Sequence, residues 1–292
     1  MIYLRKEDMM ELKTVATRAG RLSSFLKGEL KMSTGLMNRL KWGDAIRVND
    51  VPQHTDFSVQ PGDVITVRLD EPQPAYPPQD GPLTVLYEDD HILAVDKPAG
   101  MLIHPSHAQF SDTLANYVLG YYGRTGQNSA FHPVTRLDRD TFGVVLLAKN
   151  SHIHSLLQVA DLQKTYHALT FGGPQQEQGI MDAPIARRPL PSLLRYIGPE
   201  GKPSVTEFRV LERGPVCKLA LRPITGRTHQ LRLHCFHMGF PILGDPQYHT
   251  QDSKAYSDAL CLPYQLLCAH SIVFAHPLTG EMLEITSQMD VK

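Results

Sequence analysis

Two aspartates and two arginines alternate within residues 132–143, which read HPVTRLDRDTFG. The carboxylates of Asp138 and Asp140 could act as a nucleophile or as a general base, and Arg136 and Arg139 flank them. A cation beside a carboxylate lowers its pKa and keeps it ionised, as a nucleophile requires. A strongly apolar run follows directly, so the charged group lies in a loop beside a buried strand, where catalytic residues are common. Charge spacing alone still favours a surface loop with local ion pairs over a catalytic loop.

The elements that must position this loop are mostly strands. Beyond residue 82 the patterns predict strands at 83–87, 91–96, 144–149, 166–171, 205–211 and 216–221, and helices at 113–119, 153–160 and 229–238. Strands outnumber helices and do not alternate with them strictly, which argues against a doubly wound fold. We therefore expect an α+β fold with a mixed, largely antiparallel central sheet.

A proline-rich stretch divides the chain. Residues 71–82 read EPQPAYPPQDGP, and prolines at this density favour an extended chain over a helix or a central strand. The length of 292 residues also suggests about two domains. We predict a small domain at 1–70, a linker at 71–82 and a larger domain at 83–292.

The first domain has the pattern of a small RNA-binding module. Leu22, Phe25 and Leu26 recur at helical spacing, a second short helix is indicated around residue 37, and a last strand is predicted at 64–69. Two helices followed by a small strand set that closes with PGDVITV resemble the S-four type (S4-like) RNA-binding domain. That resemblance implies a small α/β domain that lays its helical face on folded RNA. An accessory domain without RNA contact is the alternative.

Further motifs accompany the aspartate loop in a fixed order. They are DDHILAVDKPAGMLIHP at 89–105, KTYHAL at 164–169, RPITGRTHQLRLH at 222–234, and the pair GDPQY at 244–248 and LCAH at 267–270. Together with RLDRDTFG they resemble the pseudouridine synthases of the RluA/RluD type. The resemblance covers about residues 83–286, and it is the order of five motifs, not any one of them, that is specific.

This resemblance implies that the protein isomerises uridine in RNA. The base is detached from ribose carbon 1′ at its nitrogen, turned, and rejoined through carbon 5, so no cofactor and no metal is expected. Asp138 matches the family's catalytic aspartate, which attacks either carbon 1′ or carbon 6 of the base. Arg227 matches the arginine that pairs with this aspartate and holds it ionised. Tyr166 matches the tyrosine that stacks on the uracil and could take the proton from carbon 5.

The uridine must leave the RNA stack before it can react, and unstacking is costly. Arg136 matches the family position whose planar guanidinium fills the vacated place. The remaining candidates for RNA binding are Lys164, His229, Gln230 and Arg232. For each of these a structural hydrogen bond or a plain surface charge is the alternative.

Two positions depart from the family motif. Thr135 stands where the family usually has His, and Phe142 stands where it usually has Ser. Neither is the nucleophile, so we expect these changes to affect the shape of the loop and the choice of substrate. Asp140 is expected to be structural, because the motif places only Asp138 at the reacting position.

Composition and charge restrict the class of protein further. The 29 Lys and Arg against 30 Asp and Glu exclude a globally basic nucleic-acid binder but allow a local basic groove. Four cysteines without a Cys-x-x-Cys pair predict free thiols, and zinc ligation by the histidines near residue 234 is not favoured. The N-terminus has no apolar signal segment, and no apolar run is long enough to span a bilayer. We expect a cytoplasmic monomer without a membrane partner.

The expected partner is structured RNA. Large-subunit rRNA is favoured, because an S-four type domain joined to this catalytic domain resembles the rRNA-directed branch, and tRNA remains open. A non-catalytic RNA-binding protein on the same fold is one alternative. A hydrolase that uses Asp138 and Asp140 as acid and base is another, but that pair needs one raised pKa, and neighbouring arginines would lower both.

Overall fold

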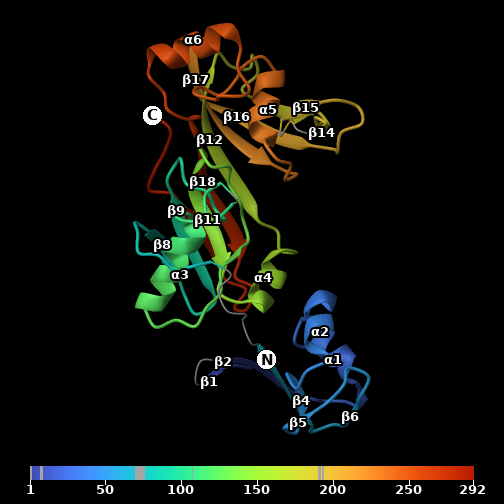
Figure 1. Cartoon of the computed structure of the whole chain (residues 1–292). Coiled ribbons are helices and arrows are strands. Elements are labelled where there is room, and N and C mark those ends of the chain that lie inside the picture. Colours follow the sequence, from blue (N-terminus) through green and yellow to red (C-terminus); the bar gives the residue numbers. More distant parts are fainter. Residues whose placement is uncertain (1, 7–8, 70–75, 107, 190–191, 193) are drawn as a thin grey trace.

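The computed structural model describes residues 2–6, 9–69, 76–106, 108–189, 192 and 194–292 (Figure 1). Residues 71–75 of the predicted linker at 71–82 lie outside this part, and residues 76–82 form neither helix nor strand. Among the helices that the structure describes, none is long and apolar enough to cross a membrane.

The chain up to residue 69 builds a small sheet and two short helices, drawn in blue in Figure 1. Its elements are β1 (Ile2–Lys6), β2 (Met9–Val15), β3 (Gly20–Arg21), α1 (Leu22–Gly28), α2 (Thr34–Leu40), β4 (Ile46–Val48), β5 (Val51–Pro52), β6 (Ser58–Val59) and β7 (Val64–Leu69). The sheet order is β1-β2-β7-β4-β5. Leu22, Phe25 and Leu26, the predicted helical stripe, are fully buried in a cluster drawn only from residues 12–69.

The rest of the chain is organised around one large sheet with the order β13-β16-β17-β12-β18-β11-β9-β8. Strand β10 pairs with β11 and β19 with β18. The strands are β8 (Thr84–Glu88), β9 (Ile92–Lys97), β10 (His132–Pro133), β11 (Phe142–Ala148), β12 (Gln163–Phe171), β13 (Gln178–Asp182), β16 (Val205–Glu212), β17 (Val216–Pro223), β18 (Leu267–Ala275) and β19 (Met282–Thr286). Only β11 and β18 run parallel among these pairs, so the expected α+β fold with a mixed, largely antiparallel sheet is confirmed.

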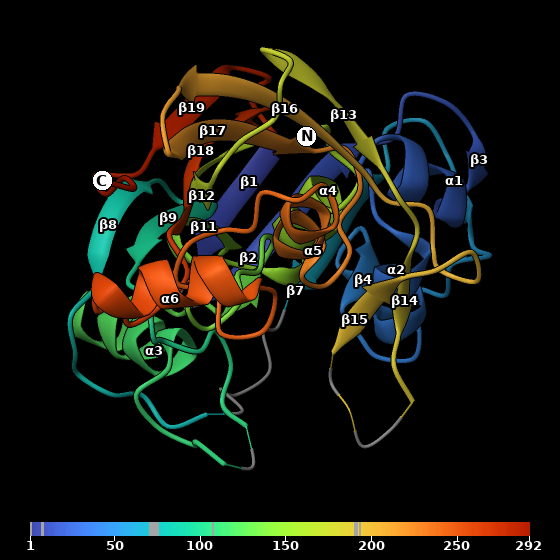
Figure 2. The same cartoon turned by 90° about the horizontal axis from the view of Figure 1, so that it is seen from above.

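Four helices and a hairpin complete this part of the structure. They are α3 (Leu114–Arg124), α4 (Ser151–Leu157), α5 (Gln230–His237), α6 (Gln251–Ala259), and the hairpin of β14 (Ile185–Arg187) and β15 (Arg195–Ile197). The view in Figure 2 shows the hairpin standing to one side of α5. The sequence patterns did not predict α6, the hairpin, β13, β18 or β19.

The centre of the sheet is covered on both faces, which explains why β9 and β11 are continuous apolar runs. Side chains alternate between the faces: Val145 and Leu147 of β11 pack toward α3, and Val144, Leu146 and Ala148 pack toward α4. Strand β11 begins with a close approach to β18. A Cβ at Gly143, where φ is +108°, would lie 2.3 Å from the carbonyl oxygen of Ala269, so this position needs glycine. The aspartate loop is thereby fixed directly before a rigid strand.

Candidate active site

A cavity of about 490 Å³ opens beside the aspartate loop, and we call it the active pocket. Its walls come from the loop before β11, from β12, and from the segment that runs from the end of β17 into α5. All eight predicted site residues line it: Arg136, Asp138, Lys164, Tyr166, Arg227, His229, Gln230 and Arg232. The fold therefore brings together side chains that lie up to 96 positions apart in the sequence.

Asp138 is held by Arg232. Its Oδ2 accepts a hydrogen bond from Nη1 of Arg232 at 3.0 Å, and its side chain is 31% exposed to the pocket. Arg232 is itself buried and binds the fully buried Asp245 through Nε at 2.7 Å and Nη2 at 2.8 Å. Burial disfavours the charge of Arg232, but the hydrogen bonds and charges of the two carboxylates outweigh it and raise its pKa. Asp138 thus faces a permanent cation in a fixed orientation.

The prediction that Arg227 pairs with Asp138 is wrong. Arg227 lies in the loop before α5, its side chain is exposed, and its Nε donates to the carbonyl of Pro203 at 3.2 Å. Arg232 lies in the first turn of α5, where the helix points it inward to both carboxylates. The predicted role of Arg232 in RNA binding is replaced by this role, because its guanidinium is occupied inside the protein.

His229 approaches Asp138 from the other side. Its Nε2 lies 3.9 Å from Oδ2 of Asp138, and its Nδ1 lies 2.9 Å from the hydroxyl of Tyr248. That hydroxyl already accepts the backbone N–H of Arg195 at 3.0 Å, so its own proton is free to point at Nδ1. Nε2 then carries the imidazole proton and directs it toward Asp138. Burial lowers the pKa of His229, with Asp138 acting in the opposite direction, which favours the neutral ring.

Lys97 holds the backbone of the aspartate loop. It is fully buried at the end of β9, and its ammonium donates to the carbonyls of Pro98, Met101 and Arg139 at 2.9, 2.9 and 2.8 Å. Arg139 directly follows Asp138, so this contact fixes the loop beside the carboxylate. Burial lowers the pKa of Lys97 to about 7, while the carboxylates of the loop act in the opposite direction.

Tyr166 and Lys164 lie side by side on β12, two residues apart and therefore on the same face of the strand. Both line the active pocket. Burial, and next the charge of Asp138, raise the pKa of the Tyr166 phenol, so it stays protonated at neutral pH. Burial lowers the pKa of Lys164. The pocket therefore presents a neutral aromatic ring beside the carboxylate.

Gln230 is buried and fully hydrogen-bonded, whereas Arg136 is exposed. The amide of Gln230 is buried; its oxygen accepts from Thr225 and the backbone N–H of Arg227, and its nitrogen donates to Val205 and Thr206. These four bonds use its full capacity, so Gln230 ties the loop to β16 and has none left for RNA. Arg136 is exposed, and within the described part of the chain it makes no hydrogen bond or ion pair.

The two departures from the family motif both have structural partners. Thr135 is buried, and its hydroxyl accepts the backbone N–H of Leu146 at 2.9 Å, which ties the start of the loop to β11. Phe142 is buried in a small apolar cluster with Cys268 and Val291, and its ring meets Tyr264 edge-on at 6.2 Å. Neither side chain competes for Asp138.

Asp140 makes a local ion pair, with Nε and Nη2 of Arg139 at 2.9 and 3.0 Å.

In the described part of the chain, one trio has the atoms to hold a metal ion: His167, His270 and Asp290. Asp290 already pairs with Lys218 at 2.7 Å and the two imidazoles stack at 3.8 Å, so we read the trio as an ion-pair network.

Sequence reasoning missed the residues that support the site. Lys97 lies in the motif at 89–105, and Asp245 and Tyr248 lie in GDPQY; both motifs were recognised, but no role was assigned to their residues. GDPQY turns back on itself, because Oδ1 of Asp245 accepts the backbone N–H groups of Gln247 and Tyr248 at 2.9 and 3.0 Å. The same carboxylate therefore shapes the turn and positions Arg232.

Comparisons with known proteins show the family of this chain. Residues 91–237 match the family model described as RNA pseudouridylate synthase. An uncharacterized RNA pseudouridine synthase YjbO of Bacillus subtilis is 34% identical over 87% of this chain and 90% of its own length. Ribosomal large subunit pseudouridine synthase C of Vibrio cholerae is 31% identical over 92% of this chain and 90% of its own. The solved structure of human RNA pseudouridylate synthase domain containing 1 superposes with a TM-score of 0.59 and 27% identity, over 73% of this chain and 86% of that one.

The fold and the pocket thus define an enzyme of the pseudouridine synthase class. The chain belongs to the RNA pseudouridine synthase family of the RluA/RluD type, and it isomerises uridine in RNA.

Proposed function

We propose that this protein converts a uridine of structured large-subunit rRNA to pseudouridine, acting as a monomer, with Asp138 as its nucleophile. The observation that carries the proposal is the carboxylate of Asp138, which opens into the active pocket while Nη1 of Arg232 holds it at 3.0 Å. A guanidinium at this distance keeps the carboxylate ionised and oriented for attack.

The reaction balances without any added group. Asp138 attacks carbon 1′ of the ribose or carbon 6 of the base, and the bond between carbon 1′ and N1 breaks. The base turns, carbon 5 bonds to carbon 1′, and the aspartate is released. The proton lost from carbon 5 is matched by one gained at N1, so substrate and product are isomers.

Tyr166 is best suited to stack on the uracil. Its phenol stays protonated because burial and Asp138 raise its pKa, so it is a poor general base at neutral pH. Its ring lines the pocket from β12, where a flipped base would lie against it. His229, which is favoured as a neutral ring, lies on the other side of Asp138, with its Nε2 3.9 Å from Oδ2.

Arg136 is the proposed residue that enters the RNA when the uridine leaves. It lies at the mouth of the pocket two residues before Asp138, it is exposed, and within the described residues no partner holds it. A free, planar guanidinium can stack between bases and still contact phosphate.

Large-subunit rRNA is proposed as the target because the Vibrio cholerae relative is named for it and aligns with 92% of this chain. A tRNA is the second candidate. The two are separated by incubating the protein with rRNA and tRNA from a bacterium that lacks this enzyme and mapping pseudouridine chemically. Pseudouridine at a defined rRNA position supports the proposal, and pseudouridine in tRNA alone overturns its target.

The same experiment tests the two other readings of the pocket. Release of free uracil would show a hydrolase. Tight binding of both RNA pools without any modified base would show a non-catalytic RNA-binding protein.

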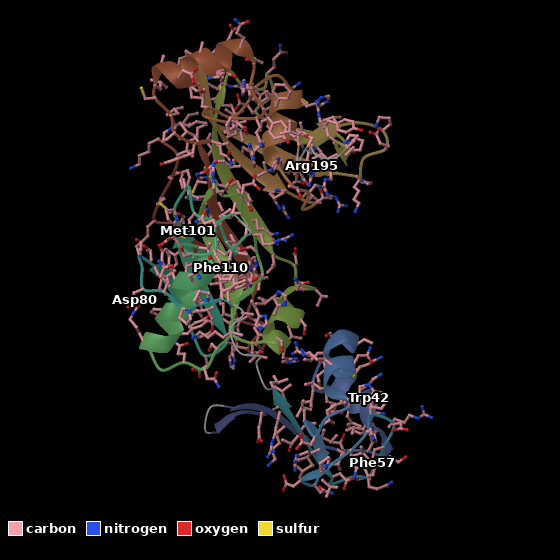
Figure 3. All side chains as sticks on the ribbon, in the orientation of Figure 1. Trp42, Phe57, Asp80, Met101, Phe110 and Arg195 are labelled. Atoms are coloured by element: carbon pink, nitrogen blue, oxygen red, sulfur yellow. The ribbon has the colours of Figure 1, made fainter. Side chains whose placement is uncertain are left out.

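The residues before 70 are proposed to form the S-four-like domain that grips the RNA. Trp42, the single tryptophan of the chain, follows α2, and it is 78% exposed. The Lys41 ammonium lies 5.1 Å from the centre of its ring, and His54 meets the ring edge-on (Figure 3 labels Trp42). An exposed ring beside a cation suits stacking on an unpaired base.

Deleting residues 1–70 tests this role. We expect weaker binding to structured rRNA, with a smaller effect on the rate at which bound RNA reacts. Quenching of Trp42 fluorescence by the same RNA would place the ring in the interface. Unchanged affinity after the deletion would remove the proposed role of this domain.

A further inference from the structure

A second cavity of about 490 Å³ adjoins the active pocket and shares Gly226, Arg227 and Thr228 with it. Its far wall is the hairpin β14–β15 together with residues 200–202, and Figure 3 labels Arg195 on this hairpin. We call this cavity the hairpin pocket. The reaction described above gives it no role, although the two cavities meet at Arg227.

Two arginines face each other in the hairpin pocket. Arg187 of β14 and Arg195 of β15 are direct partners in the antiparallel register. Like charges at directly opposed positions destabilise a pair of strands. Arg187 is exposed, and no carboxylate of the described chain forms an ion pair with it. An anion bound beside both residues would relieve the repulsion between their charges.

The rest of the hairpin pocket strengthens its positive charge. Lys202 is exposed and has no ion pair within the described residues. Within the same residues, the guanidinium of Arg227 donates one hydrogen bond, from Nε to the carbonyl of Pro203. The one carboxylate of the wall, Glu200, accepts a hydrogen bond from the hydroxyl of Tyr196. Four cations therefore line a cavity that holds a single acidic group.

We propose that the hairpin pocket binds a phosphodiester of the RNA strand, from a nucleotide that flanks the target uridine. The inference rests on the RNA substrate of the proposed function. A strand that leaves the active pocket passes over Gly226, where even a Cβ would meet nothing within 4 Å, so the RNA backbone can come close. Guanidinium groups match the geometry of phosphate oxygens. This role also accounts for Arg227, which reaches into both cavities without binding Asp138.

Binding measurements on Arg187→Gln and Lys202→Gln test the proposal. The dissociation constant for the RNA that the wild type modifies is measured between 50 and 200 mM KCl. Each phosphate contact contributes about 0.7–0.9 to the slope of log Kd against log salt, and each variant should lose about that much of the slope. Each should also bind several-fold more weakly at low salt, whereas the single-turnover rate at saturating RNA should stay within about twofold of the wild type.

Arg209→Gln is the matched control. Arg209 is also exposed, lies on β16 of the large sheet, and forms no ion pair within the described residues, but it lines neither pocket of the proposal. Its affinity and salt slope should equal those of the wild type. If Arg187→Gln and Lys202→Gln also keep the wild-type slope and affinity, the phosphate site is wrong even though the enzyme still forms pseudouridine. Absence of pseudouridine with the wild type would instead count against the proposed function.

Discussion

Asp245 binds the guanidinium of Arg232 through two hydrogen bonds, from Nε at 2.7 Å and Nη2 at 2.8 Å, and so leaves Nη1 directed at Asp138. The carboxylate of Asp245 is fully buried and is fixed in turn by the backbone of its own turn. The nucleophile is thus held by a cation whose orientation another carboxylate sets. Because this charge is already oriented, no free energy is spent on reorienting these groups during the reaction.

Replacing Arg232 should damage the chemical step, and replacing Arg227 should not. Arg232→Lys keeps the charge but cannot bind both carboxylates at once, and we expect the single-turnover rate to fall about 10²- to 10³-fold, which corresponds to about 3–4 kcal/mol. Arg227→Gln should weaken RNA binding and leave the rate at saturating RNA within about twofold. Equal rate losses in the two variants would contradict the assignment of Arg232.

Asp245→Asn should affect both stability and rate. It leaves the buried Arg232 without its main counter-charge, and breaking a buried ion pair costs about 3–5 kcal/mol. We expect a fall of about 3 kcal/mol in the free energy of unfolding in urea, together with slower turnover. Asp258→Asn is the control, because Asp258 pairs with Lys254 on the surface and should contribute less than about 1 kcal/mol. A wild-type rate in Asp245→Asn would show that Asp245 does not position Arg232.

The buried Lys97 should give stability a defined dependence on pH. Its pKa is about 7 in the folded protein and near 10.5 when exposed, so between these values the native state has released a proton that the unfolded state still binds. Its contribution to stability is therefore lost as pH falls through 7 and grows as pH rises. We compare the free energy of unfolding of the wild type with that of Lys97→Met at pH 7 and at pH 9. The difference, wild type minus variant, should rise by about 2 kcal/mol from pH 7 to pH 9. A constant difference would mean that Lys97 keeps its proton when folded.

Strands β8, β9, β11, β12, β16 and β17 and the residues that line the active pocket could be predicted from the sequence, because hydrophobic patterns and motifs are local. The partner of Asp138 could not. Arg227 and Arg232 are five residues apart in one motif, and only the start of α5 at Gln230 decides that Arg232 turns inward and Arg227 stays in the loop. The role of Asp245 was hidden for a similar reason. It depends on a turn that places a carboxylate 13 positions from its arginine.

Hairpin β14–β15 shows another limit of sequence patterns. Each of its strands has three residues, too few to show an alternating pattern, and its two arginines become neighbours only through the antiparallel register. The proposal of a phosphate site therefore depends on a strand pairing that the structure shows and the sequence does not.

The most direct test of the account is single-turnover pseudouridine formation by Asp138→Asn on the rRNA that the wild type modifies, with the affinity for that RNA measured in parallel. Asparagine keeps the shape of the side chain and removes the charge that attacks. We predict affinity within a few-fold of the wild type and no detectable pseudouridine. Pseudouridine formation at the wild-type rate would contradict the central claim that Asp138 is the nucleophile.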